Sequence, residues 1–189
     1  TTVIVNAPAG AGKSTLLPLA LMNEAWLAGK KILMLEPRRL AARSIAERMS
    51  GLLDEPIGRT IGYRIRFDTK VGQQTKIEVL TEGILTRMLH SDNELRDVGL
   101  IVFDEFHERS IPADVALALC REAQQVLRPD LRIMIMSATL DMPLLADLLK
   151  AAVVISKGRP FDVELFYTGD IDERMMPEMA AHTISKAVK

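Results

Sequence analysis

The sequence has one cysteine, few aromatic residues, almost no net charge and no long apolar run. With Cys120 alone, the chain can form neither an internal disulfide nor a cysteine-based metal site, and its three histidines are too scattered for a zinc cluster. The 24 Lys and Arg balance 25 Asp and Glu, which excludes a protein that binds nucleic acid through bulk positive charge. No apolar stretch approaches the ~18 residues of a membrane helix and no signal segment opens the chain, so we expect no membrane partner and a cytoplasmic location.

What the sequence does contain is an alternation of short apolar runs and longer amphipathic stretches. Hydrophobic residues make up 48% of the 189 residues, enough for the aliphatic core of one domain. The periodicity predicts strands at residues 3–6, 32–35, 61–65, 77–80, 100–103, 133–136 and 153–155, and helices at 14–28, 40–53, 82–89, 113–127 and 142–149. Continuous apolar strands separated by helices indicate an α/β fold, with a mostly parallel sheet covered by helices on both faces.

The composition changes near Lys157-Gly158-Arg159-Pro160. We expect residues 1–158 to form one domain, and residues 159–189 to form a connection and the first helical segment of a second domain. The chain starts without methionine and stops within a helix-like stretch, so we also expect it to be a fragment.

The first expected strand runs into Ala7-Pro8-Ala9-Gly10-Ala11-Gly12-Lys13-Ser14-Thr15, and a helix is expected to follow. This segment matches the P-loop pattern G-x-x-x-x-G-K-[ST] except that Ala7 replaces the first glycine. Small residues let backbone N–H groups surround a phosphate, Lys13 reaches the β- and γ-phosphates, and the Ser14 hydroxyl is a ligand for Mg²⁺. A Gly/Ala-rich turn with an exposed lysine is the alternative, which the flanking strand and helix disfavour. The pattern predicts a nucleotide site formed by Ala9, Gly10, Ala11, Gly12, Lys13, Ser14 and Thr15.

A second polar segment, Asp104-Glu105-Phe106-His107-Glu108-Arg109, follows the apolar strand at 100–103. Ligands of open α/β sheets bind at the carboxyl ends of strands, so we expect Asp104 to hold Mg²⁺ and Glu105 to polarise the attacking water. An Asp-Glu pair alone is more typical of a solvated loop, but this one lies about ninety residues after a P-loop. His107 is either a coupling residue or an ordinary, partly buried histidine.

Three further segments carry weaker signals. Arg38 and Arg39 stand at an expected helix start, where positive charge is unfavourable, which indicates a nearby anion or else a solvated pair. Ser137-Ala138-Thr139 follows a strand and is also typical of a helix-entry turn. Arg64 and Arg66 alternate on one strand face beside Tyr63 and Phe67, a pattern that suits nucleic-acid contact and the charged edge of a sheet equally well.

Five segments of the chain occur in the order in which helicases have them. Together they make the chain resemble the first RecA-like domain of the DEAH/DExH-box superfamily 2 helicases over about residues 1–168. They are Gly10-Ala11-Gly12-Lys13-Ser14, Pro37-Arg38-Arg39-Leu40-Ala41-Ala42, Thr81-Glu82-Gly83-Ile84-Leu85, Asp104-Glu105-Phe106-His107-Glu108-Arg109-Ser110 and Ser137-Ala138-Thr139. Phe106, where the family more often has alanine, is typical of a bacterial branch.

The resemblance implies an ATP-dependent RNA helicase with a RecA-like P-loop NTPase domain. It places ATP and Mg²⁺ at the P-loop with Asp104 and Glu105, and adenine stacking at Arg48. It implies that His107 and Ser137-Ala138-Thr139 couple the γ-phosphate state to domain movement. It also implies contacts with the backbone of a single strand, which the resemblance makes RNA. These contacts are assigned to Arg38, Arg39, Thr81, Glu82, Gly83 and Arg64.

The resemblance also implies what this chain needs from elsewhere. The family's arginine fingers belong to a second RecA-like domain in cis, of which residues 159–189 are expected to be only the start. An arginine finger contributes about 10³–10⁵ in rate, so we expect the fragment alone to be a nearly inactive ATP hydrolase and a monomer. Glu36 stands where the family commonly has glutamine, and because a carboxylate repels phosphate we expect Glu36 to pair with a neighbouring arginine.

Two other classes of protein stay open. The first is a different P-loop NTPase, such as a small-molecule kinase or a transporter ATPase, but neither an arginine-rich lid nor a Ser-Gly-Gly signature is present. The second is a nucleotide-gated interaction module without unwinding activity, against which the intact Lys13, Asp104 and Glu105 argue.

Overall fold

The computed structural model describes residues 1–138, 143–157, 164–165, 167 and 172–188. The chain divides into two compact units, Thr1–Gly158 and Arg159–Lys189. The second unit contains the short 3₁₀ helix η3 (Glu173–Met175) and α6 (Met176–Ala187). Its assignment to the start of a second RecA-like domain stays a prediction.

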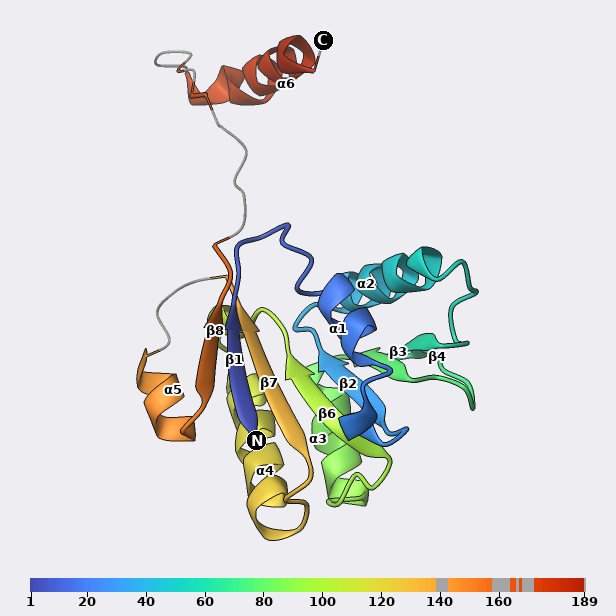
Figure 1. Ribbon diagram of the computed structural model, residues 1–189. Coiled ribbons are helices and arrows are strands. Elements are labelled where there is room, and N and C mark those ends of the chain that lie inside the picture. The colour runs from blue at the N-terminus through green and yellow to red at the C-terminus, as the bar shows by residue number, and fades with distance from the viewer. Residues whose placement is uncertain (139–142, 158–163, 166, 168–171, 189) are drawn as a thin grey trace. The chain divides into compact units, whose positions relative to one another are not determined.

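The first unit is built on one sheet of eight strands in the order β4-β3-β5-β2-β6-β7-β1-β8 (Figure 1). All neighbouring strands are parallel except the β3–β4 pair. The strands are β1 (Thr2–Asn6), β2 (Lys31–Leu35), β3 (Ile61–Ile65), β4 (Asp68–Lys70), β5 (Ile77–Leu80), β6 (Val98–Phe103), β7 (Arg132–Ser137) and β8 (Ala152–Ile155). The pattern did not predict β4, because its three residues are polar and carry no apolar run.

Alternate side chains of the central strands enter two separate hydrophobic cores, one on each face of the sheet. In β2, Leu33 and Leu35 belong to one core and Ile32 and Met34 to the other. The first core is covered by α3 (Glu82–Ser91), α4 (Ile111–Val126) and α5 (Pro143–Leu149), and the second by α1 (Leu16–Leu21), η1 (Ala25–Leu27) and α2 (Arg39–Leu52). The predicted α/β class, with a mostly parallel sheet and helices on both faces, is therefore confirmed.

The first helix differs from the prediction, which extended over residues 14–28. Helix α1 begins only at Leu16 and ends at Leu21, and η1 follows after a turn. Asparagine is a poor helix former, and Asn23 accepts a hydrogen bond from Lys76 Nζ at 2.9 Å instead of continuing the helix. The left-handed backbone of Ala28 and Gly29 then ends the segment before β2. Within the described residues, no helix is both long and apolar enough to cross a bilayer.

Candidate nucleotide and nucleic-acid site

The polar segments predicted from the sequence meet because the strands before them are in register. Asn6 at the end of β1 lies opposite Ser137 of β7, and Leu35 of β2 lies between Leu80 of β5 and Phe103 of β6. The loops that follow β1, β2, β5, β6 and β7 therefore leave the sheet at one edge. This is the carboxyl edge, where open α/β folds bind their ligands.

The backbone of the P-loop requires Gly10 and Gly12, whereas the first pattern position tolerates Ala7. Gly10 and Gly12 have φ values of +78° and +80°, which L side chains rarely adopt. A Cβ on Gly12 would also lie 2.9 Å from Leu16 Cδ1. Ala7, in contrast, has no positive φ, is buried, and donates its N–H to the Ser137 carbonyl at 3.1 Å. Alanine at the first pattern position is thus compatible with the loop.

Lys13 joins the P-loop to the acidic segment. Its side chain is 6% exposed, and its Nζ lies 3.1 Å from Glu105 Oε1. Glu105 itself has a left-handed backbone, with φ +47°, a conformation that costs free energy and is concentrated at functional sites. A buried ammonium paired with one carboxylate is the kind of group that a phosphate can engage.

Asp104 has the properties of a metal ligand. It is 4% exposed, and its Oδ1 accepts the Glu105 N–H at 2.9 Å. The Ser14 hydroxyl hydrogen-bonds to the same carboxylate, whereas Oδ2 is buried with no hydrogen-bond partner. Burial raises the pKa of Asp104. An orphaned carboxylate oxygen beside a serine hydroxyl fits Mg²⁺, which usually takes one or two protein ligands and completes its shell with water and phosphate.

One predicted coupling residue, His107, lies beside the acidic pair, and two others lie next to the P-loop. His107 Nδ1 is 3.4 Å from Glu105 Oε2, within ion-pair distance, but it makes no hydrogen bond. Ser137 is fully buried next to the start of the P-loop, and Ala138 is half-buried. Thr139 lies outside the described residues.

The expected pairing of Glu36 with an arginine is wrong. Glu36 is 3% exposed, its Oε2 has no hydrogen-bond partner, and the guanidinium of Arg38 pairs instead with Glu108 at 2.7 Å. Glu36 continues the sheet ladder by donating its N–H to the Leu80 carbonyl, so its side chain is buried while that of Arg38 is exposed. Burial, reinforced by the charges of Asp104 and Glu105, raises the pKa of Glu36 to about 8.

A groove of about 890 Å³ collects most of the residues expected to bind nucleic acid. Its lining includes Arg39, Thr81, Glu82 and Gly83. The lining also includes Arg66 and Phe67 from the turn between β3 and β4, which the sequence left open as a nucleic-acid contact; Phe67 is 90% exposed and the Arg66 guanidinium lies 4.7 Å from its ring centroid. An exposed Arg-Phe pair at the end of a strand is the sequence signal for this part of the groove.

Two of the expected site residues are not brought to these groups. Arg64 Nε donates to Glu78 Oε2 at 2.6 Å, and this 2% exposed carboxylate also accepts from Lys31. Arg64 is therefore an ion-pair residue within the sheet and does not line the groove of Arg39 and Thr81. Arg48 is exposed on α2 and, within the described part of the chain, makes no hydrogen bond or ion pair.

The parallel sheet, the glycine-dependent loop and the acidic strand end are together those of a RecA-like P-loop NTPase domain. The family of DEAD/DEAH box helicases matches residues 1–148, and the chain belongs to this family. It is similar to the ATP-dependent RNA helicase HrpB of Escherichia coli (strain K12), with 56% identity over 166 residues, 87% of this chain and 20% of that protein. It is 33% identical over 201 residues, 100% of this chain and 28% of the relative, to the probable ATP-dependent RNA helicase DHX35 of Homo sapiens.

A solved structure agrees with the sequence comparisons. The crystal structure of Escherichia coli DEAH/RHA helicase HrpB matches with a TM-score of 0.81 and 55% identity, over 86% of this chain and 21% of that one. The chain thus spans about a fifth of the length of the HrpB proteins that it matches. The predicted family and the RecA-like fold are confirmed.

Proposed function

We propose that this chain is the Mg–ATP-binding half of an ATP-driven motor that moves on single-stranded RNA. The observation that carries the proposal is the cluster of Lys13, Asp104 and Glu105 at the carboxyl edge, beside the groove of Arg39 and Thr81. The relatives' names as ATP-dependent RNA helicases support it.

Each group of the cluster has a distinct role. Residues 9–15 receive the phosphates through backbone N–H groups, and Lys13 exchanges its contact with Glu105 for the β- and γ-phosphates. Ser14 and Asp104 would hold Mg²⁺, which when bound neutralises charge on the phosphate oxygens. Glu105, released by Lys13, orients the attacking water and accepts its proton. His107 and the segment from Ser137 connect this site to domain movement.

The groove binds the strand through its phosphates. We assign these contacts to Arg39, Thr81 and Gly83, with Arg38 joining when it leaves Glu108. Phosphate contacts carry no base information, so binding is largely independent of sequence, and only a contact to the 2′-hydroxyl selects RNA over DNA. A second RecA-like domain in cis completes the ATP site of a monomeric, cytoplasmic protein, and without it hydrolysis is very slow.

The test is steady-state ATP hydrolysis by the full-length protein that contains this chain, with and without single-stranded RNA, alongside Glu105→Gln. We expect strong stimulation by RNA that the substitution abolishes while nucleotide binding is retained. Stimulation by single-stranded DNA of equal size would remove the RNA preference. RNA-independent turnover would favour a different P-loop NTPase, and nucleotide binding without any turnover would favour a nucleotide-gated interaction module.

A further inference from the structure

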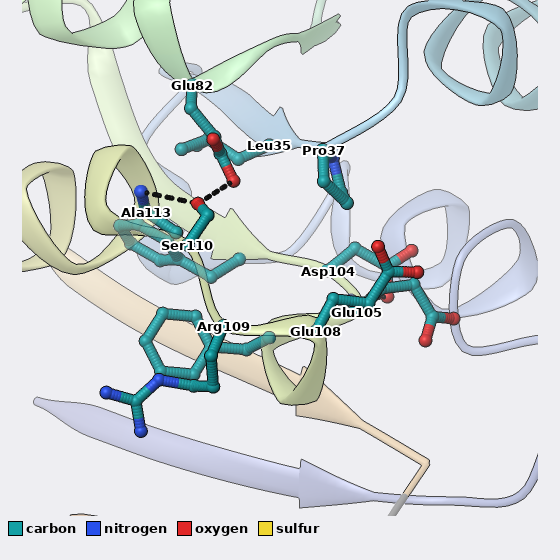
Figure 2. Close-up of a pocket in the computed structure, with 11 residues that line it drawn as sticks. Leu35, Pro37, Glu82, Asp104, Glu105, Glu108, Arg109, Ser110 and Ala113 are labelled. Atoms are coloured by element: carbon teal, nitrogen blue, oxygen red, sulfur yellow. Dashed lines mark hydrogen bonds between the residues drawn. The ribbon is translucent and has the colours of Figure 1, made fainter.

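A single hydroxyl connects the acidic segment to the start of the groove. Ser110 ends the segment that follows β6, and as the N-cap of α4 it accepts the Ala113 N–H at 3.0 Å. The same hydroxyl donates to Glu82 Oε1 at 2.8 Å, across 28 residues of sequence (Figure 2). Glu82 is the first residue of α3. The N-termini of two neighbouring helices are therefore linked by one side-chain hydrogen bond.

Glu82 lies at the boundary between two cavities. It lines the groove that holds Arg39 and Thr81, and it also lines a small cavity of about 90 Å³ against Asp104, Glu105 and Ser110. Figure 2 shows its carboxylate directed at Ser110. A carboxylate repels phosphate, and this one is already engaged, so Glu82 is better placed to sense the groove than to bind the strand.

The segment between Glu105 and Ser110 is stiff enough to transmit a displacement. Phe106 is 3% exposed and packs edge-to-face on Phe103, with ring centroids 5.9 Å apart. Backbone hydrogen bonds from the N–H groups of Glu108 and Arg109 to the carbonyls of Glu105 and Phe106 close the turn. Because only four residues separate Ser110 from Glu105, a shift at Ser110 reaches the catalytic carboxylate.

The packing of α3 on α4 joins the two helices that the Ser110–Glu82 hydrogen bond connects. Leu85 and Leu89 of α3 share one core with Ala116 and Cys120 of α4. This shared core holds the two helices together, and the Ser110–Glu82 bond at their N-terminal ends fixes how Thr81 and Gly83 sit relative to the acidic segment.

We propose that Glu82 and Ser110 are positioning residues, through which a strand bound in the groove sets the position of Glu105 for hydrolysis. This inference rests on the proposed function, and it moves Glu82 from the set of strand ligands to the coupling machinery. The contact adds nothing to nucleotide binding, and it acts on the rate at which bound ATP is hydrolysed once RNA is present.

The first test is Ser110→Ala in the full-length protein. We expect the RNA-stimulated kcat to fall about tenfold, a usual size for one coupling contact, while RNA-independent hydrolysis, KM for ATP and half-saturation by RNA stay unchanged. Ser110→Thr keeps both hydrogen bonds and should keep the stimulation. A loss of structure alone would change KM, binding and kcat together.

Because Ser110→Ala also removes a helix cap, a second pair of variants separates the two roles. Ser110→Asp still accepts the Ala113 N–H but cannot donate to Glu82, and the two carboxylates repel, so stimulation should fall. Adding Glu82→Gln reverses the polarity of the bond, since the glutamine amide donates to the aspartate. We expect this double variant to regain at least half of the lost stimulation.

The outcomes distinguish the inference from the proposed function. A wild-type protein that RNA does not stimulate overturns both. Wild-type stimulation that persists in Ser110→Ala, or a double variant that is as defective as Ser110→Asp alone, overturns the coupling role of this contact and leaves the proposed function standing.

Discussion

The two ends of the same sheet treat buried polar groups in opposite ways. At the amino end, Arg128 is 7% exposed, and its guanidinium donates to the carbonyls of Glu94, Leu95 and Val98 and to Asp130. Gln124, 5% exposed, donates to the carbonyls of Leu131 and Thr1. At the carboxyl end, Glu36, Asp104 and His107 each keep a buried polar atom without a partner.

This difference separates polar groups that stabilise the fold from polar groups that are kept for a ligand. A buried donor or acceptor without a partner costs free energy, so native proteins have few of them. Of the four such atoms among the described side chains, three stand around the P-loop and the acidic segment, and only that of Ser50 does not. The amino end thus satisfies its buried polar groups within the chain, whereas the carboxyl end leaves three buried polar atoms available to a ligand.

The largest expected effect breaks the network at the amino end. Arg128→Ala leaves three backbone carbonyls without their donor, and we expect the free energy of unfolding to fall by about 3 kcal/mol in urea unfolding of the 189-residue chain. Arg96→Ala is the matched control, because its 77% exposed side chain pairs with Glu94 at the surface and should contribute little to stability. Equal losses in the two variants would contradict the comparison.

At the carboxyl end, Lys13→Ala should leave stability nearly unchanged and weaken ATP binding about 100-fold, because a buried charge-assisted contact to phosphate is lost. Fluorescence anisotropy with a labelled ATP analogue measures this. Lys30→Ala removes the same charge from the amino end, where Lys30 pairs with Asp130, and should bind like the wild type. Retained affinity in Lys13→Ala would show that the P-loop does not hold the phosphates.

The charge of Glu36 is expected to lower the stability of the fold, so that removing it should stabilise the chain. The pKa of Glu36 in the folded chain, about 8, lies above the usual 4.5, so the folded state binds the extra proton. Stability should therefore be highest below pH 4.5 and fall as the pH rises to about 8. Glu36→Gln does not titrate, so we expect it to unfold nearly like the wild type at pH 5 and to be clearly the more stable of the two at pH 8. Thermal unfolding of both proteins at pH 5 and at pH 8 measures this difference. A variant that is less stable than the wild type at pH 8 would refute the interpretation that Glu36 is buried without a charged partner.

The smallest effect concerns the exposed Arg38–Glu108 pair. Glu108→Gln releases Arg38 for phosphate, and because surface ion pairs are weak we expect single-stranded RNA to bind only about two- to threefold more tightly at low salt. Glu47→Gln makes the same charge change on α2, where Glu47 pairs with Arg43, and should not alter RNA binding. An equal gain in both variants would assign the effect to net charge alone.

The α/β class, the P-loop and the acidic strand end could be predicted from the residues alone, because they follow from local periodicity and from residue types at fixed spacing. Arg39 and Thr81, which the family resemblance assigned to one binding surface, line one groove, since parallel strands end on the same side. The short α1 depended on a contact between residues distant in sequence, Lys76 with Asn23, and the polar strand β4 depended on its antiparallel pairing with β3.

Which polar groups contact one another depends on how the strands are ordered in the folded chain. The tertiary structure buried Glu36 without a charged partner, paired Arg64 with Glu78, and joined Ser110 to Glu82 across 28 residues. No spacing along the chain contains that information, because strands far apart in sequence become neighbours through the packing of both helical layers. The residue types therefore set which chemistry is possible, and the strand order sets which side chains share it.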